Sequence, residues 1–435
     1  MSEQNYSFET KRIHAGYDPQ AHNDSVNVPI YQTASFNFRD FDRAQRILRG
    51  VEIASVYSRV TNPTVGALEE RLRQLDEGAA AIAFASGMAA ITSTLLFLAE
   101  GGGNILYASS LYGGTQETLA NFLTRFGVQT RAVAARHDPA AYEALIDENT
   151  RAVYLESVSN PNAELYDIEA IAEAAHRHGV PLVVDNTVAT PYLFQPLKHG
   201  ADIAVYSLTK GLSGHGSLIG GAVVEKGGFH YDEKRFPQFY AKSYKIRDIH
   251  ANPRSPIDFA PEFPLVIALR MFYLEFLGAA LSPFDAYLAL QGMSTLVERL
   301  DKQVATTQKL VRHLQSRAEV QWVRHPSAQG SPYAALAQRY FPRGAGALFS
   351  FGFNGTREQL REFIGALRLF SYHVNLGDVR SLIVNSAETT HGEFPPEVLA
   401  QADIPWNLVR VSVGLENADD LIADLDQAFQ KAFAG

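Results

Sequence analysis

The chain has 435 residues, a formal net charge of −9 and no cysteine. Charges of both signs are spread along it without a basic cluster, which argues against a nucleic-acid or anionic-membrane partner. The missing cysteines exclude disulfides, thiolate metal sites and a cysteine nucleophile, and we expect no metal site. Because the start over residues 1–19 is polar and lacks the apolar core of a secretion signal, we expect a cytoplasmic protein.

The first third of the chain contains two contrasting segments. Residues 1–60 show no regular apolar period and are expected to form an extended N-terminal arm. Residues 79–99 carry no charge over about the length of a membrane span, but Ser86-Gly87 interrupts them and small residues dominate. We therefore expect a short buried strand over 80–85, a turn and then a buried helix.

From residue 80 to 224, short apolar runs alternate with segments of helical period. Many of the runs are continuously apolar, which is typical of strands covered on both faces in a mostly parallel sheet. Ligands bind such sheets at the carboxyl ends of the strands. The strand-like runs are AIAFA, NILYA, VQTRAV, RAVYLES, PLVVDN and DIAVYSL, and the clearest helical segments are GGTQETLANFLTRF and DIEAIAEAAHRHG.

The rest of the chain has a different organisation. Residues 230–264, rich in proline and aromatic side chains, are interpreted as an insertion or linker, and a long helical pattern covers 282–317. Three strand patterns, ALFSFGF, SLIVNS and NLVRVSVG, then alternate with two helical ones. The sequence thus predicts an α/β fold in three parts: the arm over 1–60, a ligand-binding domain over 61–264, and a smaller α+β domain over 265–435.

Three polar features follow strands in the second part. The helix expected to begin near Ser86, Gly87 and Met88 offers backbone N–H groups to a phosphate, although a turn made for close packing has the same sequence. Asp185 follows a buried strand, where a carboxylate needs a cationic partner unless it caps a helix. Lys210 follows the next strand, and an isolated lysine in a loop is ordinarily a solvated charge.

Together these features fit pyridoxal phosphate (PLP) chemistry. A lysine amine attaches to the cofactor aldehyde and acts as a base once released. A carboxylate beside the pyridine nitrogen keeps that nitrogen protonated, so that the ring accepts electrons, and a helix N-terminus holds the phosphate. The combination favours a PLP enzyme over a non-catalytic binding or scaffold protein.

Eight motifs occur in the order of the Cys/Met-metabolism family of PLP enzymes, which the chain resembles over nearly its whole length. They are VYSRVTNPT (56–64), ASGMAA, LYGGT (111–115), SVSNP (157–161), VDNT, SLTKGLSGHG, NLGDVRSL and VRVSVGLE (409–416). The resemblance implies a fold type I enzyme, with helices on both faces of a mostly parallel central sheet, PLP bound by the 61–264 domain, and a smaller α+β C-terminal domain.

The resemblance also assigns roles to residues. Lys210 would carry the cofactor and move protons together with Tyr112, which would stack on the cofactor ring. Further cofactor contacts would come from Tyr57, Arg59, Ser86, Gly87, Met88, Asn160, Asp185, Ser207 and Thr209. The substrate would contact Tyr57, Asn160, Asn375 and Arg410, the last of which would bind its carboxylate. Because Tyr57 and Arg59 would reach the phosphate of a neighbouring subunit, the family implies a homo-oligomer with shared active sites, expected to be a tetramer.

Within the family, several segments resemble the sulfhydrylase branch, among them SGHGSLIGGAVVEKGGF, GAALSPFDAYLALQGM and the 230–264 insertion. Gly114 stands where methionine γ-lyases carry a cysteine, and Asn375 stands where lyases and synthases carry a serine. Two departures are expected to lie near the pocket: Tyr206 replaces a more usual histidine, and Ala163-Glu164 replaces a glycine-rich turn.

The sulfhydrylase branch implies γ-replacement on O-acetyl-L-homoserine. Sulfide would give L-homocysteine and acetate, and a small thiol would give methionine. The alternatives are a methionine or homocysteine γ-lyase and a transsulfuration enzyme of the cystathionine γ-synthase type. The sequence leaves the sulfur donor and the acyl group open.

Overall fold

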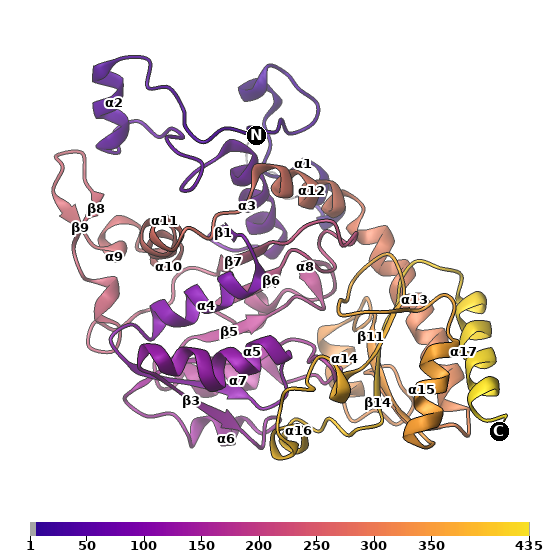
Figure 1. Cartoon of the computed structure of the whole chain (residues 1–435). Helices are drawn as coiled ribbons and strands as arrows, with labels where there is room; N and C mark the ends of the chain where they lie inside the picture. Colours follow the sequence, from indigo (N-terminus) through magenta and orange to yellow (C-terminus); the bar gives the residue numbers. More distant parts are fainter. Residues whose placement is uncertain (1–5, 435) are drawn as a thin grey trace.

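The computed structural model describes residues 6–434, so that residues 1–5 of the predicted arm lie outside the described residues. A seven-stranded sheet in the order β1-β7-β6-β5-β4-β2-β3 forms the centre of the larger part (Figure 1). The six predicted strands are all present: β1 (Ala80–Phe84), β2 (Gly103–Ala108), β3 (Val128–Val133), β4 (Thr150–Glu156), β5 (Leu182–Asp185) and β6 (Ile203–Ser207). Strands β6, β5, β4, β2 and β3 are parallel, while β7 (Gly221–Glu225) runs antiparallel between β1 and β6, which confirms the mostly parallel sheet.

The segment over residues 79–99 folds as the sequence predicts, into β1 and then helix α4 (Gly87–Leu98). All five residues of β1 are buried, and α4 packs against β6 and β7. Within residues 6–434 no helix combines the length and the apolar character needed to cross a membrane. The uncharged run is therefore explained by burial inside the larger part of the protein.

Helix α7 (Ile168–His176) also follows its sequence signals. The Asp167 side chain caps it by accepting a hydrogen bond from Ala170 N–H at 3.2 Å. Gly179, just beyond the helix, has φ +64°, a left-handed conformation that glycine adopts without a steric penalty. The capping residues thus define both ends of this helix.

Other helical patterns are more broken than expected. The 113–126 segment begins as α5 (Gly113–Glu117) and continues as a π-helical turn over 118–122 and a 3₁₀ turn over 123–126. The 282–317 pattern forms two helices, α12 (Pro283–Ser294) and α13 (Leu296–Gln315). They separate at Thr295, where the Gly292 carbonyl accepts hydrogen bonds from the Thr295 N–H and the buried Arg299 guanidinium.

The C-terminal part has its own sheet, in the order β10-β11-β14-β13-β12. Strands β11 (Leu348–Phe353), β13 (Leu382–Asn385) and β14 (Leu408–Ser412) were predicted, whereas β10 (Val320–Arg324) and β12 (Ser371–Tyr372) were not. Helices α13, α15 (Arg357–Ala366) and α17 (Ala418–Ala432) pack around an aromatic core that contains Phe351, Phe363 and Phe429. The domain boundaries themselves stay predictions.

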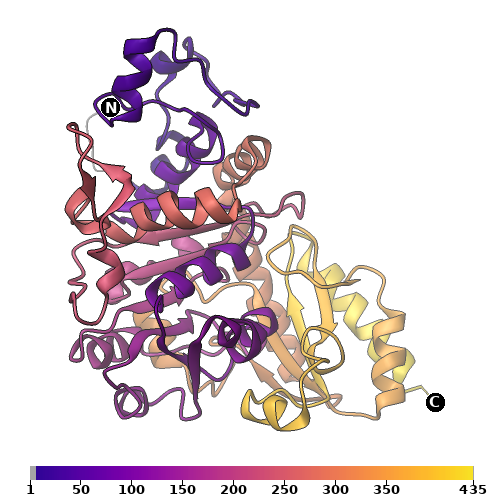
Figure 2. The ribbon, with the colours of Figure 1, turned by 60° about the vertical axis from the view of Figure 1, so that its left-hand side comes forward.

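The N-terminal segment and the 230–264 insertion lie at the periphery. In Figure 2 the N-terminal segment projects away from the C-terminal part, which lies on the opposite side of the larger sheet. The arm contains two short helices, α1 (Phe8–His14) and α2 (Phe41–Leu48), so it is less extended than expected. The insertion forms a small hairpin, β8 (Ser243–Arg247) with β9 (Pro253–Arg254), followed by helix α9 (Pro256–Phe259).

Candidate active site

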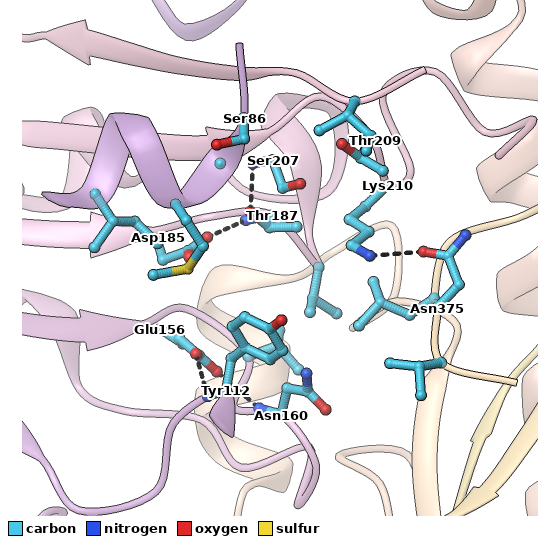
Figure 3. A pocket seen from close by; sticks show the side chains of 18 of the residues that line it. Ser86, Tyr112, Glu156, Asn160, Asp185, Thr187, Ser207, Thr209, Lys210 and Asn375 are labelled. Carbon is cyan, nitrogen blue, oxygen red and sulfur yellow. Dashed lines mark hydrogen bonds between the residues drawn. The ribbon is translucent and has the colours of Figure 1, made fainter. Parts of the chain in front are cut away.

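A cavity of about 250 Å³ lies at the carboxyl ends of β4, β5 and β6, where the C-terminal part meets the larger sheet (Figure 3). Most of the residues predicted from the sequence line it. They are Ser86, Gly87, Met88, Tyr112, Asn160, Asp185, Ser207, Thr209, Lys210, Asn375 and Arg410. The fold therefore brings together side chains that are separated by more than 300 positions in the chain.

One end of the pocket is suited to a phosphate. The Ser86 hydroxyl caps α4 by accepting from Ala89 N–H at 3.0 Å, and the N–H groups of Gly87 and Met88 have no intrahelical acceptor. A Cβ atom at Gly87 would lie only 2.8 Å from Ser207 Cβ, so a side chain there would collide with the end of β6. The free N–H groups at a helix N-terminus are the donors that a phosphate requires.

The carboxylate of Asp185 lies at the end of β5, inside the pocket. It accepts hydrogen bonds from Thr187 N–H at 2.9 Å and from the Tyr154 hydroxyl at 3.2 Å. Burial raises its pKa above the ordinary value. No lysine, arginine or histidine of residues 6–434 forms an ion pair with it, so a cationic ring nitrogen would supply the missing partner.

Glu156, at the end of the adjacent strand β4, is a pocket residue that the sequence reasoning missed. Its Oε1 accepts from Tyr112 N–H at 2.6 Å and its Oε2 accepts from Asn160 N–H at 2.8 Å. Burial, together with the charge of Asp185, raises the pKa of Glu156 well above its ordinary range. The sequence does contain a signal for Glu156: it is a carboxylate at the end of an apolar strand in YLES, just as Asp185 is in VVDN.

Lys210 lies on the turn that follows β6 and points toward the C-terminal part. Its Nζ donates a hydrogen bond to Asn375 Oδ1 at 2.6 Å. Burial, and the nearby charge of Arg410, lower the pKa of the Lys210 amine to about 8. An amine with a pKa in this range exchanges protons readily near neutral pH.

Arg410 belongs to β14 and is 3% exposed. Its Nη1 donates to Asn160 Oδ1 at 3.0 Å and its Nη2 donates to the Asn375 carbonyl at 2.7 Å, while its Nε is buried without a partner. Burial lowers its pKa to about 10, and no carboxylate of residues 6–434 pairs with it. A buried, planar guanidinium without a counter-ion is prepared for an anionic ligand.

Tyr57 and Arg59 are the two predicted site residues that do not line the pocket of their own chain. They lie on the N-terminal segment, where the Tyr57 ring is 43% exposed and the Arg59 guanidinium stacks on it at 5.0 Å from the ring centroid. Their predicted role in a neighbouring subunit remains a prediction.

The expectation that Tyr206 lies near the pocket is wrong. Successive residues of a strand point to opposite faces of the sheet, so Tyr206 points away from the face that presents Ser207. The Tyr206 hydroxyl is fully buried, where it donates to Asp76 Oδ2 at 2.7 Å and accepts from Asn186 Nδ2 at 3.1 Å. The tyrosine therefore belongs to the internal packing of the larger sheet.

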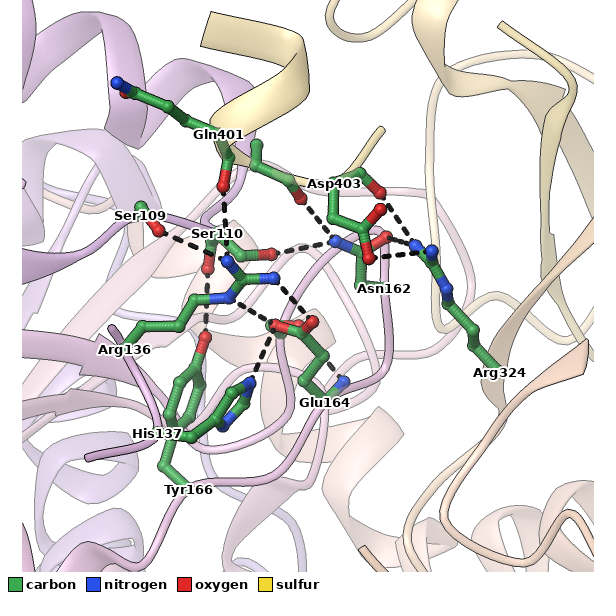
Figure 4. A network of polar contacts seen from close by, with 12 residues as sticks. Ser109, Ser110, Arg136, His137, Asn162, Glu164, Tyr166, Arg324, Gln401 and Asp403 are labelled. Carbon is green, nitrogen blue, oxygen red and sulfur yellow. Dashed lines mark hydrogen bonds and ion pairs between the residues drawn. The ribbon is translucent and has the colours of Figure 1, made fainter. Parts of the chain in front are cut away.

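The second departure, Ala163-Glu164, lies in a polar network beside the pocket (Figure 4). Ala163 has φ +53°, a conformation that glycine favours, which explains why a glycine-rich turn is common at this point. The Glu164 carboxylate forms a buried ion pair with Arg136 at 2.8 Å, and Arg136 also donates to the Gln401 carbonyl at 3.2 Å. The turn after Asn160 thus binds the C-terminal part instead of entering the pocket.

The parallel strands, the helix N-terminus, the lysine and the carboxylate define a PLP-dependent enzyme of fold type I. Residues 9–430 match the model of the Cys/Met metabolism PLP-dependent enzymes. The chain is 40% identical to homocysteine synthase of Schizosaccharomyces pombe over 98% of each protein, and 38% identical to L-methionine gamma-lyase of Pseudomonas putida over 97% of each. The chain belongs to this family, and its cofactor is PLP.

A solved structure supports the same assignment. It is described as an O-acetylhomoserine (thiol)-lyase from Campylobacter jejuni with a pyridoxyl-lysine monophosphate group. The two structures superpose with a TM-score of 0.91 at 36% sequence identity, over 98% of this chain and 100% of the other.

Proposed function

We propose that the enzyme catalyses γ-replacement on O-acetyl-L-homoserine, in which sulfide takes the place of acetate and L-homocysteine is formed. A small thiol such as methanethiol would give methionine in the same way. The observation that carries the proposal is the position of Asn375 between two cationic groups: its side chain accepts from Lys210 and its carbonyl accepts from Arg410. An amino-acid substrate with its carboxylate at Arg410 would therefore have its α-carbon beside the Lys210 amine.

The cofactor, when bound, supplies an aldehyde for covalent attachment and a ring that stabilises negative charge at the substrate α-carbon. Lys210 would hold it and would then move protons between substrate carbons, a role that suits its lowered pKa. Tyr112 would cover the ring and assist these transfers, and Asp185 would bind the ring nitrogen. The phosphate would bind the N–H groups of α4 together with Ser86, Ser207 and Thr209.

The composition of the pocket favours a small sulfur donor. Its charged side chains, within the described part of the chain, are Lys210, Arg410, Asp185 and Glu156, and each has a role or a partner already. Cysteine, the donor of a cystathionine γ-synthase, would bring a second ammonium and a second carboxylate that need partners of their own. Sulfide and small thiols carry no such groups.

The composition also favours an acetyl leaving group. Beside these charged groups and the polar ones, the pocket presents a set of apolar side chains: Met88, Ile91, Val158, Val188, Ile219, Val374 and Leu376. A succinyl or phospho group would place another negative charge against these side chains, whereas the acetyl methyl group would contact them favourably.

A methionine γ-lyase is the second candidate, because the same apolar lining also fits the methylthio end of methionine. Purified holoenzyme would be given O-acetyl-L-homoserine with sulfide and, separately, L-methionine alone. We expect homocysteine formation to be at least about tenfold faster than release of α-keto acid. Faster keto-acid release from methionine would refute γ-replacement as the main activity.

We further propose a homo-oligomer, a tetramer built from dimers that share active sites. The N-terminal segment supports this, because Leu48, Val51, Ile53 and Tyr57 expose apolar surface next to Arg59. The arm would cross to a second copy and bring Tyr57 and Arg59 to its phosphate.

Mixing two inactive variants tests the sharing. Arg59→Ala and Lys210→Ala subunits, unfolded and refolded together, would form one intact site in each mixed dimer, giving about a quarter of the unmodified activity after random assembly. Activity no higher than that of the separate variants would refute shared sites, and sedimentation of the unmodified enzyme would give the number of subunits.

A further inference from the structure

Glu156 lines the pocket, yet none of the roles proposed above uses it. We propose that Glu156 is a positioning residue: its carboxylate joins the two loops that carry Tyr112 and Asn160 and thereby sets where both side chains lie over the cofactor. The inference rests on the proposed roles of those two residues. The Glu156 carboxylate is hydrogen-bonded to the main chain of both loops, and its proposed action on the chemistry is through Tyr112 and Asn160.

The geometry that supports this role is a pair of main-chain hydrogen bonds. Tyr112 comes four residues after β2 and Asn160 four residues after β4, two strands that lie side by side in the sheet. One oxygen of Glu156 accepts from Tyr112 N–H at 2.6 Å and the other accepts from Asn160 N–H at 2.8 Å. Figure 3 shows Glu156 beside these two residues, with both hydrogen bonds drawn.

The carboxylate of Glu156 is the hydrogen-bond acceptor for one main-chain N–H group in each loop. Tyr112 occupies the cap position of α5 with φ −52° and ψ 133°, and its side chain makes no capping hydrogen bond. Asn160 precedes Pro161, whose ring nitrogen has no hydrogen to donate. The carboxylate therefore supplies an acceptor to each loop where the chain has left regular structure.

The chemistry requires a carboxylate and not an amide. Both groups that face Glu156 are N–H donors, and a carboxylate has two acceptor oxygens and no donor. A glutamine would direct its NH₂ group at one of the two N–H groups. The two N–H donors favour the ionised form of Glu156, whereas burial and the charge of Asp185, its register partner on β5, oppose it.

The test compares Glu156→Gln with a matched control, Glu225→Gln. Glu225 is also a buried carboxylate at the end of a strand, and it accepts two main-chain N–H groups, from Leu265 at 3.3 Å and Val266 at 2.9 Å, but it does not line the pocket. With both variants loaded with PLP, we expect kcat/KM to fall about 10- to 100-fold for Glu156→Gln, as displacement of catalytic groups predicts, and to stay within about twofold for Glu225→Gln.

Two further measurements separate positioning from general loss of structure. Hydrogen–deuterium exchange of the cofactor-free proteins should show exchange at Tyr112 or Asn160 N–H at least about tenfold faster in Glu156→Gln, and unchanged there in Glu225→Gln. In a Tyr112→Phe background, Glu156→Gln should cost clearly less than in the unmodified enzyme, because the hydroxyl that it positions has already been removed.

An equal cost of Glu156→Gln in both backgrounds, or kcat/KM within about twofold of the unmodified enzyme at full cofactor loading, would overturn the proposal. If Glu156→Gln does not bind PLP, Glu156→Asp replaces it in the test. This variant keeps the carboxylate but moves it one methylene group away from the two N–H groups, and the expected and overturning results are the same. Rates are measured with whichever amino acid the unmodified enzyme converts. Failure of O-acetyl-L-homoserine as a substrate therefore refutes the proposed function and leaves this test valid.

Discussion

The two sheets contribute to the pocket in different ways. The seven-stranded sheet supplies side chains from the ends of parallel strands and the turns beyond them. Glu156 and Asp185 end β4 and β5, and Lys210 follows the neighbouring β6. The five-stranded sheet supplies Arg410 from within β14 and Asn375 from the loop after β12. Strand ends converge wherever a parallel sheet forms, whereas the second wall depends on how two separately folded sheets meet.

This difference divides the proposed chemistry. The first wall holds the groups that would bind the cofactor and move protons. The second wall holds the groups that would select the substrate. Two hydrogen bonds between pocket-lining side chains, Lys210–Asn375 and Asn160–Arg410, join it to the first wall. Variants of the two walls should therefore fail in different ways.

The largest effect is expected from the first wall. Lys210→Ala removes the amine that attaches the cofactor, so turnover should fall by about 10³-fold or more and the visible absorption of the holoenzyme should be lost or shifted. Lys242→Ala, at an exposed lysine of the insertion, should change neither property. Steady-state rates and an absorption scan check both variants, and an active Lys210→Ala enzyme would contradict the assignment.

On the second wall, Arg410→Lys should leave cofactor binding intact and impair substrate binding. A lysine cannot reproduce the two separate donors that reach Asn160 and Asn375, so we expect KM for the amino acid to rise about 10- to 100-fold with unchanged absorption. Arg361→Lys, on the exposed face of α15, is the control. Loss of the cofactor in Arg410→Lys would remove the distinction between the two walls.

A smaller effect is expected at Gly114, which lies close to the Tyr112 ring. A Cβ atom there would lie 2.6 Å from Tyr112 Cε1, so Gly114→Ala should displace the Tyr112 ring and lower kcat about tenfold. Gly365, on α15, has open space around its Cβ position, and Gly365→Ala should keep full activity. Equal activity of the two alanine variants would show that the position of the Tyr112 ring does not limit the rate.

The smallest effect on activity is expected at Asp76, a buried acid of the larger part that lies outside the pocket. Burial raises its pKa to about 7, above the value of about 4 in an unfolded chain, so stability falls as the pH rises from about 4 to about 7 and stays reduced above that. Asp76→Asn should remove this loss. The free energy of unfolding of the variant, relative to that of the unmodified protein, should therefore rise by about a few kcal/mol between pH 5 and pH 8, as measured from unfolding midpoints. Parallel midpoints across this range would show that Asp76 is ionised in the folded protein.

The two walls also differ in how far the sequence predicts them. Asp185 and Lys210 could be placed in one site because each follows a continuously apolar strand, and parallel strands end at a common edge. The local pattern shows Arg410 only as an arginine that interrupts an apolar strand, and its predicted role comes from the family resemblance. Its contacts with Asn160 and Asn375 depend on packing between the two sheets, which no local pattern encodes.

Two errors in detail have equally physical causes. The role of Glu156 is not found by sequence patterns because its partners are main-chain N–H groups, one of them 44 positions away at Tyr112, and main-chain donors carry no signal in the residue types. Tyr206, expected near the pocket as a departure from the family pattern, precedes the pocket residue Ser207, but the alternation of side chains along β6 turns it to the opposite face.

The position of β14 has a consequence for how the enzyme's substrate range changes over time. Arg410 lies on the central strand of its sheet, paired on both sides, whereas Val374 and Asn375 lie on a loop with no strand partner. Side-chain substitutions at 374–376 alter the side of the pocket beside Lys210, and they keep the main-chain carbonyl of residue 375, which accepts from the Arg410 guanidinium. Laboratory selection for a new acyl group or a new thiol should therefore accumulate changes in this loop and leave β14 untouched.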